Sequence, residues 1–295
     1  MIEAKGFLRY LLSKQTVDDR ALNKDVLAAL RTNLPAGPVS VVEIGAGIGT
    51  MLLRMLRWNL ITEGSYTLVD ELEENIQFGL AYLPEWATQS GFNAVEIEPN
   101  TWKIKDNGHS VTVKFVHADV FEYLSRQPAP ADLLVAHAFL DLMPLPARLP
   151  DLLSLTKDLA WLTINFDGVS SLLPEIDPEL DRKIERLYHQ TMDIRASGGD
   201  SQIGRKLFGY LAEADAEILA AGASDWVVHP HGGSYPADEA YFLEFILGFY
   251  RESLSQHPEL DVSTFTQWLQ TRRDQIMRGE LVYIAHQFDF LVKRD

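Results

Sequence analysis

The chain has 295 residues, of which 46% are hydrophobic, so it can bury a sizeable core. Lysine and arginine number 26 against 42 aspartates and glutamates, which gives a formal net charge of −16 at pH 7. Because nucleic-acid affinity rests largely on cationic side chains, this balance argues against a nucleic-acid partner. The chain has no cysteine, which excludes disulfides, thiolate metal sites and cysteine nucleophiles.

Neither secretion nor membrane insertion is expected from the sequence. The first residues, MIEAKGFLRYLLSK, have an acid at position 3 and no sustained apolar run, so we expect no signal peptide. No stretch approaches the ~18–20 apolar residues of a membrane span. We therefore expect a cytoplasmic protein without a membrane partner.

Two helices are predicted first, over residues 3–14 and 16–33, and the second ends before Pro35-Ala-Gly-Pro38. Short β-rich runs then alternate with helical patterns, as is typical of parallel βαβ units. Between residues 92 and 118 an antiparallel excursion interrupts the alternation. Strands are predicted at residues 39–44, 66–70, 113–117, 132–137 and 160–166, and helices at residues 50–60, 72–83, 120–126 and 142–155.

Beyond residue 167 the pattern becomes helical, and strands return at residues 225–230 and 281–294 with two more helices between them. One apolar stripe consists of Leu180, Ile184 and Leu187, and another of Leu207, Leu211, Ala214 and Ile218. Aromatic residues at helical spacing predict either the packed core of a cap or a lid that shapes an apolar pocket: Tyr241, Phe242, Phe245, Phe249, Tyr250 and Trp268.

Three glycines at every second position follow the first predicted strand and open a helix in VVEIGAGIGTMLLRML, residues 41–56. Because they lack Cβ atoms, Gly45, Gly47 and Gly49 let the backbone turn tightly and approach a ligand, and the helix N-terminus offers free N–H groups. The dinucleotide fingerprint G-x-G-x-x-G has its third glycine one residue later, and the Gly-Lys-Ser/Thr of a Walker loop is missing. The loop by itself predicts a nucleotide-type ligand without specifying which.

The segment E-I-G-A-G-I-G-T resembles the first motif of class I S-adenosylmethionine-dependent methyltransferases of the small-molecule type, and the resemblance covers residues 39–166. Asp70 ends the second predicted strand, where the family's acid takes the ribose hydroxyls. Asp119 follows the third, where the family places an acid near the adenine amine and an apolar residue against the ring. The resemblance implies S-adenosylmethionine as cofactor, bound by Glu43, Gly45, Ala46, Gly47, Gly49, Asp70, Glu71, Asp119, Val120 and His137.

The chemistry of that ligand agrees with these residue types. It carries a sulfonium cation, a ribose diol and an adenine amine, for which Glu43, Asp70 and Asp119 can supply negative potential and hydrogen-bond acceptors. Any one of these acids could be an incidental, solvated residue at a strand end. Three of them at consecutive strand ends beside a glycine loop favour one shared site.

The alternation and the resemblance together predict a single α/β domain over residues 1–295. Its sheet is doubly wound, seven-stranded and mainly parallel, with an antiparallel last strand and helical cap insertions. Residues 1–36 form N-terminal lid helices and residues 37–167 the cofactor-binding core. Residues 168–224 hold a helical insertion and the last core helix, and residues 225–295 the closing strand pair with a helical insertion at 236–279. A homodimer is a possible assembly.

The acceptor is narrowed by motifs that are missing. No N/D-P-P-Y/F follows the fourth strand, which argues against nucleobase or glutamine methylation, and cysteine-dependent carbon methylation of pyrimidines is impossible here. We therefore predict in-line methyl transfer to an oxygen or nitrogen of a small molecule. Two alternatives stay open: other S-adenosylmethionine chemistry, such as aminocarboxypropyl transfer or non-methylating catalysis, and a non-catalytic protein that binds the cofactor and an interaction partner.

His137 and Asp141 are the candidate catalytic residues. His137 stands at the mouth of the fourth strand, where it can contact the substrate or act as a base, or be a structural residue bonded to a nearby loop. Asp141 follows one helical turn later and can also simply cap the next helix.

Further substrate contacts are predicted at His229, His231 and Tyr235 in HPHGGSYP, and at Tyr10. The two histidines lack a third ligand, so no metal site is predicted. Tyr10, Lys14 and Arg20 are expected to close over the cofactor tail. Arg20 can pair with the carboxylate of that tail or form a surface salt bridge.

Overall fold

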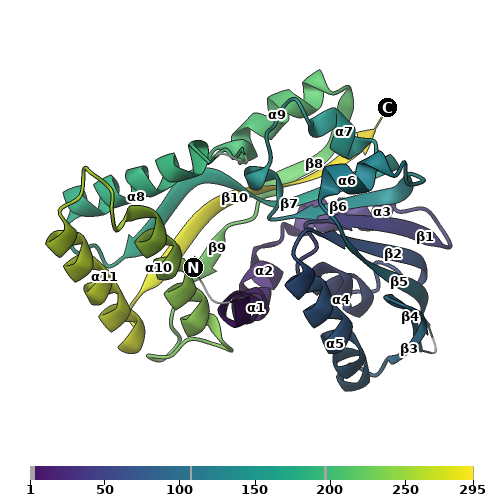
Figure 1. Ribbon diagram of the computed structural model, residues 1–295, viewed down its shortest axis with the longest axis horizontal. Helices are drawn as coiled ribbons and strands as arrows, with labels where there is room; N and C mark the ends of the chain where they lie inside the picture. Colours follow the sequence, from purple (N-terminus) through teal and green to yellow (C-terminus); the bar gives the residue numbers. More distant parts are fainter. Residues whose placement is uncertain (1–3, 107, 196–197, 295) are drawn as a thin grey trace.

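The computed structural model describes residues 4–106, 108–195 and 198–294. Five neighbouring strands form the parallel centre of the sheet (Figure 1). In spatial order they are β5 (Ser110–His117), β2 (Glu63–Asp70), β1 (Val39–Ile44), β6 (Ala131–His137) and β7 (Thr156–Leu173). The strand β10 (Val282–Arg294) then pairs antiparallel with β7 and with β8 (Ala216–Ala223). This order confirms the predicted α/β class, mainly parallel with an antiparallel last strand. The described sheet has ten strands, three more than the seven predicted.

The chain reverses its direction of travel across the sheet between β1 and β6. From β1 it moves outward through β2 to β5, and it then crosses back to place β6 on the other side of β1. In open α/β sheets the crevice at such a switch point, beyond the carboxyl ends of the strands, is where ligands bind.

Helices cover both faces of this sheet. On one face lie α3 (Lys24–Asn33), α4 (Thr50–Arg57) and α5 (Glu73–Gln89). On the other lie α6 (Val120–Ser125), α7 (Leu149–Leu153) and α9 (Ile203–Glu213). Val41 faces the first of these cores, whereas Val42 and Ile44 face the second, as strand alternation requires. The predicted antiparallel excursion is present as β3 (Asn93–Glu98) and β4 (Thr101–Lys105), which extend the sheet beyond β5.

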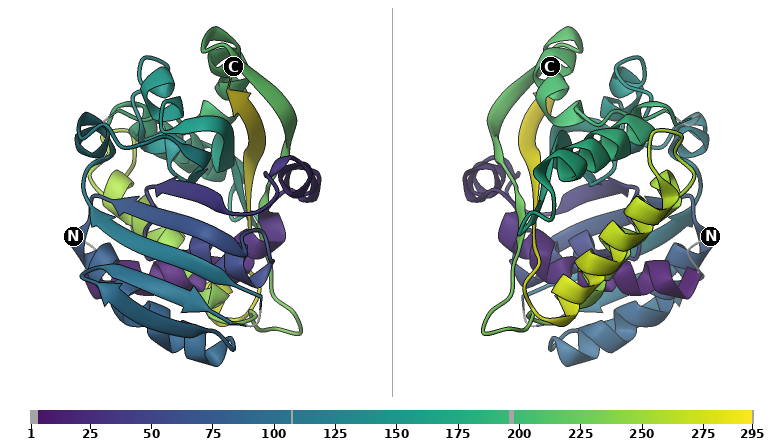
Figure 2. Two further views of the ribbon diagram at one scale, coloured as in Figure 1. Left: turned by 90° about the vertical axis from the view of Figure 1, so that its right-hand side faces the viewer. Right: turned by 90° about the vertical axis from the view of Figure 1, so that its left-hand side faces the viewer.

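The long strands β7 and β10 continue past the central sheet and form an arm, which faces the viewer in the right-hand view of Figure 2. We call this part the cap. It comprises the outer ends of β7 and β10, the short strand β9 (Trp226–Val228), and the helices α8 (Pro178–Asp193), α10 (Glu239–Leu254) and α11 (Val262–Met277). Phe242, Tyr250 and Trp268 are buried in it. These predicted aromatics therefore form its packed core.

The N-terminal helices α1 (Ala4–Ser13) and α2 (Gln15–Ala21) lie between the cap and the central sheet (Figure 1). The helix predicted over residues 16–33 is in fact two helices, α2 and α3. Asn23 separates them because its side chain accepts hydrogen bonds from the N–H groups of Asp25 and Val26 and so starts a new helix. Its own N–H donates to Asp289 in β10 at 2.8 Å, which fixes the break against the sheet.

Two further expectations were wrong. Residues 142–155 were expected to form one helix, but only the short turn η1 (Leu140–Leu142) and α7 are helical, because the prolines at 144 and 146 interrupt the pattern. Ile218 was expected on a helix but lies in β8. The pairing with β10 outweighs the helical tendency of AEILAAGA, and Gly222 lets the Asn23 side chain approach, since a Cβ there would lie 2.3 Å from Asn23 Nδ2.

The strand pair that closes the sheet is therefore β8 and β10, and part of the strand predicted at residues 225–230 is the separate strand β9. In the part of the chain that the structure describes, no helix is both long enough and apolar enough to cross a membrane.

Candidate functional site

A cavity of about 580 Å³ lies at the switch point between β1 and β6. One wall consists of the glycine loop and the residues that follow β2, β5 and β6. The rest of the lining is mostly apolar and comes from α1 and from the segment after β6: Phe7, Leu11, Phe139, Leu142, Met143 and Pro144. The volume falls in the range of small-molecule sites.

The glycine loop has the backbone conformation that its sequence predicts. Gly45, Gly47 and Gly49 have φ angles of 61°, 55° and 85°, in the left-handed region that favours glycine. A Cβ on Gly45 would lie 2.1 Å from Phe139 Cδ2, so this position also has no room for a side chain. Gly45, Ala46 and Gly47 line the cavity, whereas Gly49 lies behind it and caps the start of α4.

Two of the predicted acids are held in place by hydrogen bonds from the backbone. The carboxylate of Asp70 accepts from the N–H of Gly47 at 2.7 Å and of Leu72 at 3.0 Å, and from Asn75 Nδ2 at 2.9 Å. Asp119 caps α6 by accepting from the N–H of Phe121 at 2.8 Å. Both acids line the cavity, together with the predicted Glu71 and Val120. The loop and these strand ends therefore form a common wall.

Glu43 lines the cavity from β1 and is only 2% exposed. Burial raises the pKa of its carboxyl to about 8, although the hydrogen bond from the Tyr66 hydroxyl at 2.8 Å and the nearby Arg54 oppose this shift. Glu43 is therefore largely neutral at pH 7, and a cation arriving in the cavity would favour its ionised form.

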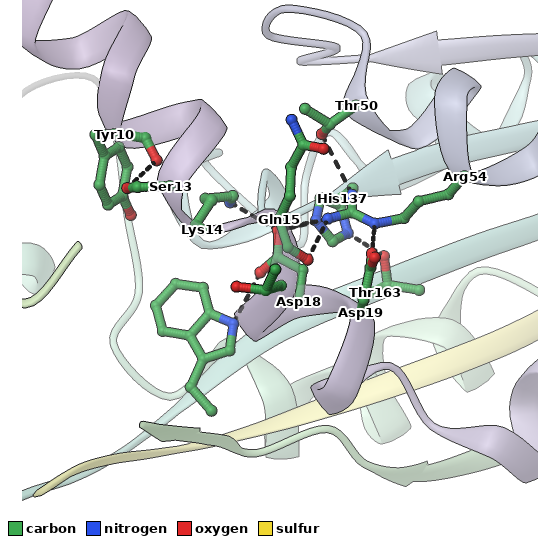
Figure 3. Close-up of polar contacts among 12 residues, drawn as sticks. Tyr10, Ser13, Lys14, Gln15, Asp18, Asp19, Thr50, Arg54, His137 and Thr163 are labelled. Atoms are coloured by element: carbon green, nitrogen blue, oxygen red, sulfur yellow. Dashed lines mark hydrogen bonds and ion pairs between the residues drawn. The ribbon is translucent and has the colours of Figure 1, made fainter. Parts of the chain in front are cut away.

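His137 reaches the cavity wall from the end of β6, but its ring is committed to the protein. Its Nε2 lies 3.0 Å from Asp18 Oδ2 and its Nδ1 lies 2.8 Å from Thr163 Oγ1 (Figure 3). Burial lowers the pKa of His137 to about 4, despite the attraction of Asp18. A neutral ring that donates from Nε2 to Asp18 and accepts at Nδ1 from Thr163 satisfies both bonds. The sequence allowed either a catalytic or a structural role for His137, and this arrangement is the structural one.

Asp18 is the centre of a buried charge cluster that the sequence analysis missed (Figure 3). Its carboxylate is fully buried, and Oδ2 lies 3.3 Å from Arg54 Nη2 and 3.6 Å from Lys14 Nζ. Oδ1 accepts from Trp226 Nε1 at 2.9 Å. Burial alone would raise the pKa of Asp18, but Lys14, His137 and Arg54 hold it below its ordinary value. The cluster joins the N-terminal helices to α4, β6 and β9.

One signal in the sequence could have revealed this cluster. Arg54 interrupts the apolar run MLLRML of the predicted helix 50–60, and a charge on a buried helix face requires a partner. In the structure Arg54 is 1% exposed and also pairs with Asp19 and with Thr50 Oγ1.

Of the remaining predicted residues, Lys14 lines the cavity, whereas the others lie outside its wall. Tyr10 is buried against the cap, where its ring stacks on Phe245 at a centroid distance of 4.4 Å. His229 and His231 are exposed in a turn, and the Tyr235 hydroxyl donates to Leu281 O at 2.8 Å. In the structure these four predicted substrate contacts therefore do not line the cavity.

Arg20 and Asp141 also lie outside the wall. Arg20 pairs with Glu239 on α10, at 2.6 Å and 2.9 Å, so in the structure it holds the cap rather than a ligand. Asp141 follows the cavity-lining Phe139, and its Oδ1 is buried without a hydrogen-bond partner among the described residues. Burial raises the pKa of Asp141. Within residues 4–106, 108–195 and 198–294, no three His, Asp or Glu side chains are grouped so that they could hold a metal ion.

The mainly parallel sheet with an antiparallel last strand is the arrangement that the sequence resemblance implied. No protein-family model matches the chain, and neither does a curated protein. Among solved structures it is similar to an S-adenosylmethionine-dependent methyltransferase from Thiobacillus denitrificans in complex with S-adenosylhomocysteine. That match has 14% identity and a TM-score of 0.46, over 97% of this chain and 98% of that chain.

Two other solved structures are similar over most of the chain. The plantazolicin methyltransferase BpumL in complex with S-adenosylhomocysteine has 14% identity and a TM-score of 0.42, over 100% of this chain and 89% of that chain. The mycolic acid cyclopropane synthase CmaA1 has 10% identity and a TM-score of 0.46, over 91% of this chain and 81% of that chain. None of these matches assigns a role to a residue of this chain.

The charge cluster predicts a large stability cost for Asp18→Asn. Neutralising Asp18 leaves Arg54 and Lys14 buried without their shared counter-charge, so we expect the free energy of unfolding at pH 7 to fall by roughly 3–5 kcal/mol. Denaturant unfolding measures this value. Asp19→Asn is the matched control, because Asp19 also pairs with Arg54 but is 27% exposed, and we expect it to cost about 1 kcal/mol. Equal costs for the two variants would contradict the central place of Asp18.

The raised pKa of Glu43 predicts how stability depends on pH. Between its ordinary value of 4.5 and about 8, the unfolded chain loses this proton and the folded protein keeps it, so stability falls as pH rises. In the Glu43→Gln variant the free energy of unfolding should fall less steeply with pH. Its slope should differ from that of the wild type by about 1.4 kcal/mol per pH unit. The exposed Glu71→Gln serves as control and should keep the wild-type slope. An unchanged slope in Glu43→Gln would refute the assignment.

Proposed function

We propose that this protein transfers a methyl group from S-adenosylmethionine to an oxygen or nitrogen atom of a small molecule. The observation that carries the proposal is the cavity at the switch point, where the left-handed glycine loop meets Glu43, Asp70 and Asp119. A loop of this kind lets a ligand approach the protein backbone closely, and the three acids suit a cation that carries a diol and an amine.

Each part of the ligand has a chemical counterpart in the wall. Asp70 is proposed to accept from the ribose hydroxyls, since one lone pair of Oδ2 remains beyond its bond from Gly47. Asp119 is proposed to accept from the adenine amine through the oxygen that does not cap α6, with Val120 against the ring. Glu71 and Ala46 complete this wall, and Gly49 supports the loop from behind.

When bound, S-adenosylmethionine would supply an electrophilic methyl group on a sulfonium sulfur. The protein's contribution is to position the two reactants and keep water out, which is the main requirement of an in-line displacement. The apolar side chains of α1 and of the segment after β6 are suited to this task because they line the cavity together with the glycine loop. The acceptor is proposed to enter on their side.

A hydroxyl or ammonium acceptor must also lose a proton. His137 and Asp141 are our proposed catalytic residues for accepting this proton, and their surroundings differ. For His137 to accept the proton, its hydrogen bond with Thr163 would have to open. Asp141 already has a buried oxygen without a hydrogen-bond partner among the described residues, next to a segment that lines the cavity. His229, His231, Tyr235 and Tyr10 are kept as proposed contacts to the acceptor, although they lie outside the cavity wall in this structure.

The acidic balance of the chain supports a small-molecule acceptor over a nucleic acid, because few cations are available to neutralise a phosphate backbone. We also propose a cytoplasmic location, as expected from the sequence. A homodimer remains compatible with the proposal but is not required by it.

Cofactor binding is tested by thermal stabilisation. S-adenosylhomocysteine should raise the melting temperature of the wild type, and Asp70→Ala should largely remove the shift because Asp70 both orders the loop and faces the ligand. Glu63→Ala, at the opposite end of the same strand, is the matched control and should keep the shift. Stabilisation by NADH with none by S-adenosylhomocysteine would overturn the assignment of the cavity.

Transfer itself is tested with isotopically labelled S-adenosylmethionine and a metabolite extract. We expect one or more small molecules to gain the labelled methyl group, and Asp70→Ala to abolish the gain. Stabilisation by S-adenosylhomocysteine without any labelled product, in extracts of several sources, would favour the non-catalytic alternative.

A further inference from the structure

Lys14 lies at the junction of α1 and α2 and lines the cavity, although it is only 6% exposed. Among the described residues that line this cavity, it is the sole lysine or arginine. The other charged side chains of the wall are acids, so Lys14 provides the positive charge of the site. A nearly buried ammonium group is costly unless an anion or several acceptors compensate it.

The protein itself compensates Lys14 incompletely. Its Nζ is 3.6 Å from Asp18 Oδ2, beyond hydrogen-bonding distance, and that oxygen also serves His137 at 3.0 Å and Arg54 at 3.3 Å. Over the described part of the chain, no hydrogen bond uses Lys14 Nζ. An ammonium group has three N–H donors, so Lys14 keeps donors in reserve for a ligand.

The connections of Lys14 place it at one end of the cavity. Through Asp18 it is linked to Arg54 and His137, and Figure 3 shows it in the same cluster as His137 and Thr50. Thr50, His137 and Glu43 line the end near β1 and β6. Asp70 and Asp119 line the end near β2 and β5, where we have proposed the ribose and adenine. The remaining part of the cofactor, its amino-acid tail, would therefore lie at the Lys14 end.

We propose that Lys14 binds the α-carboxylate of the amino-acid tail of S-adenosylmethionine. This inference rests on the proposed function, since it assigns a residue to one part of that ligand. The tail is a zwitterion, and the cavity offers an ammonium group on Lys14 and a carboxyl group on Glu43 at the matching end. The sequence led us to expect both Lys14 and Arg20 to close over this tail, with Arg20 at the carboxylate, but Arg20 instead holds α10.

This contact also couples the tail to closure of the site. Lys14 directly follows α1, and the same helix contributes Phe7 and Leu11 to the lining of the cavity. A bond from Lys14 to the carboxylate would hold α1 in its place over the cavity. Recognition of the tail and exclusion of water would then depend on one segment.

The experiment compares two ligands by calorimetric titration: S-adenosylhomocysteine and its decarboxylated analogue, which keeps the adenosine, the sulfur and the amine. We expect the wild type to bind the complete ligand about 10- to 100-fold more tightly, as for a charge-assisted hydrogen bond in a partly buried site. Lys14→Met should lose this preference, by binding the complete ligand more weakly and the analogue unchanged. Lys24→Met, which removes an exposed lysine from α3, should behave as the wild type.

The outcomes separate this inference from the proposed function. If the wild type binds neither ligand, the proposed function fails. If the wild type binds both equally, or if Lys14→Met keeps the preference, the role of Lys14 is overturned while the cofactor assignment stands. Because the wild-type comparison needs no variant, the proposal can be refuted even if Lys14→Met does not fold.

Discussion

The buried carboxylate of Asp18 is the constraint on which the arrangement of the site depends. A charge without solvent contact must be surrounded by partners, and Asp18 takes them from the α1–α2 junction, α4, β6 and β9. The N-terminal helices, the central sheet and the cap therefore meet at one group. Displacement of any of these elements would leave a charge or a polar group buried without its partner.

The same constraint explains the chemistry of the cavity wall. Because Asp18 and Thr163 are hydrogen-bonded to the two ring nitrogens of His137, the ring is fixed in the cavity wall and would have to release Thr163 before it could accept a proton. The carboxylate of Asp18 is shared between Lys14, Arg54, His137 and Trp226. Lys14 is therefore held close to the cavity without being fully paired. Asp70 and Asp119 are held differently, by backbone N–H groups at the ends of parallel strands.

The predictions from the sequence were correct where local patterns decide the structure. The alternation of short apolar runs and helical patterns predicted all five parallel strands, because strands buried on both faces need continuous apolar residues. The errors occurred where another interaction outweighed the local pattern. Asn23 capped a new helix, the prolines after Asp141 interrupted one, and pairing with β10 made Ile218 part of a strand.

The glycine loop, the acids at the strand ends and the fold class can be read from the amino-acid sequence, because they depend on local backbone requirements and on hydrophobic periodicity. Which distant charges share a buried partner depends on how the chain folds. Asp18 and His137 are 119 positions apart, and Asp18 and Trp226 are 208 apart, so no local pattern relates them. That is also why the structure separated Lys14, which faces the cavity, from Arg20, which holds the cap: burial and pairing are properties of the folded chain.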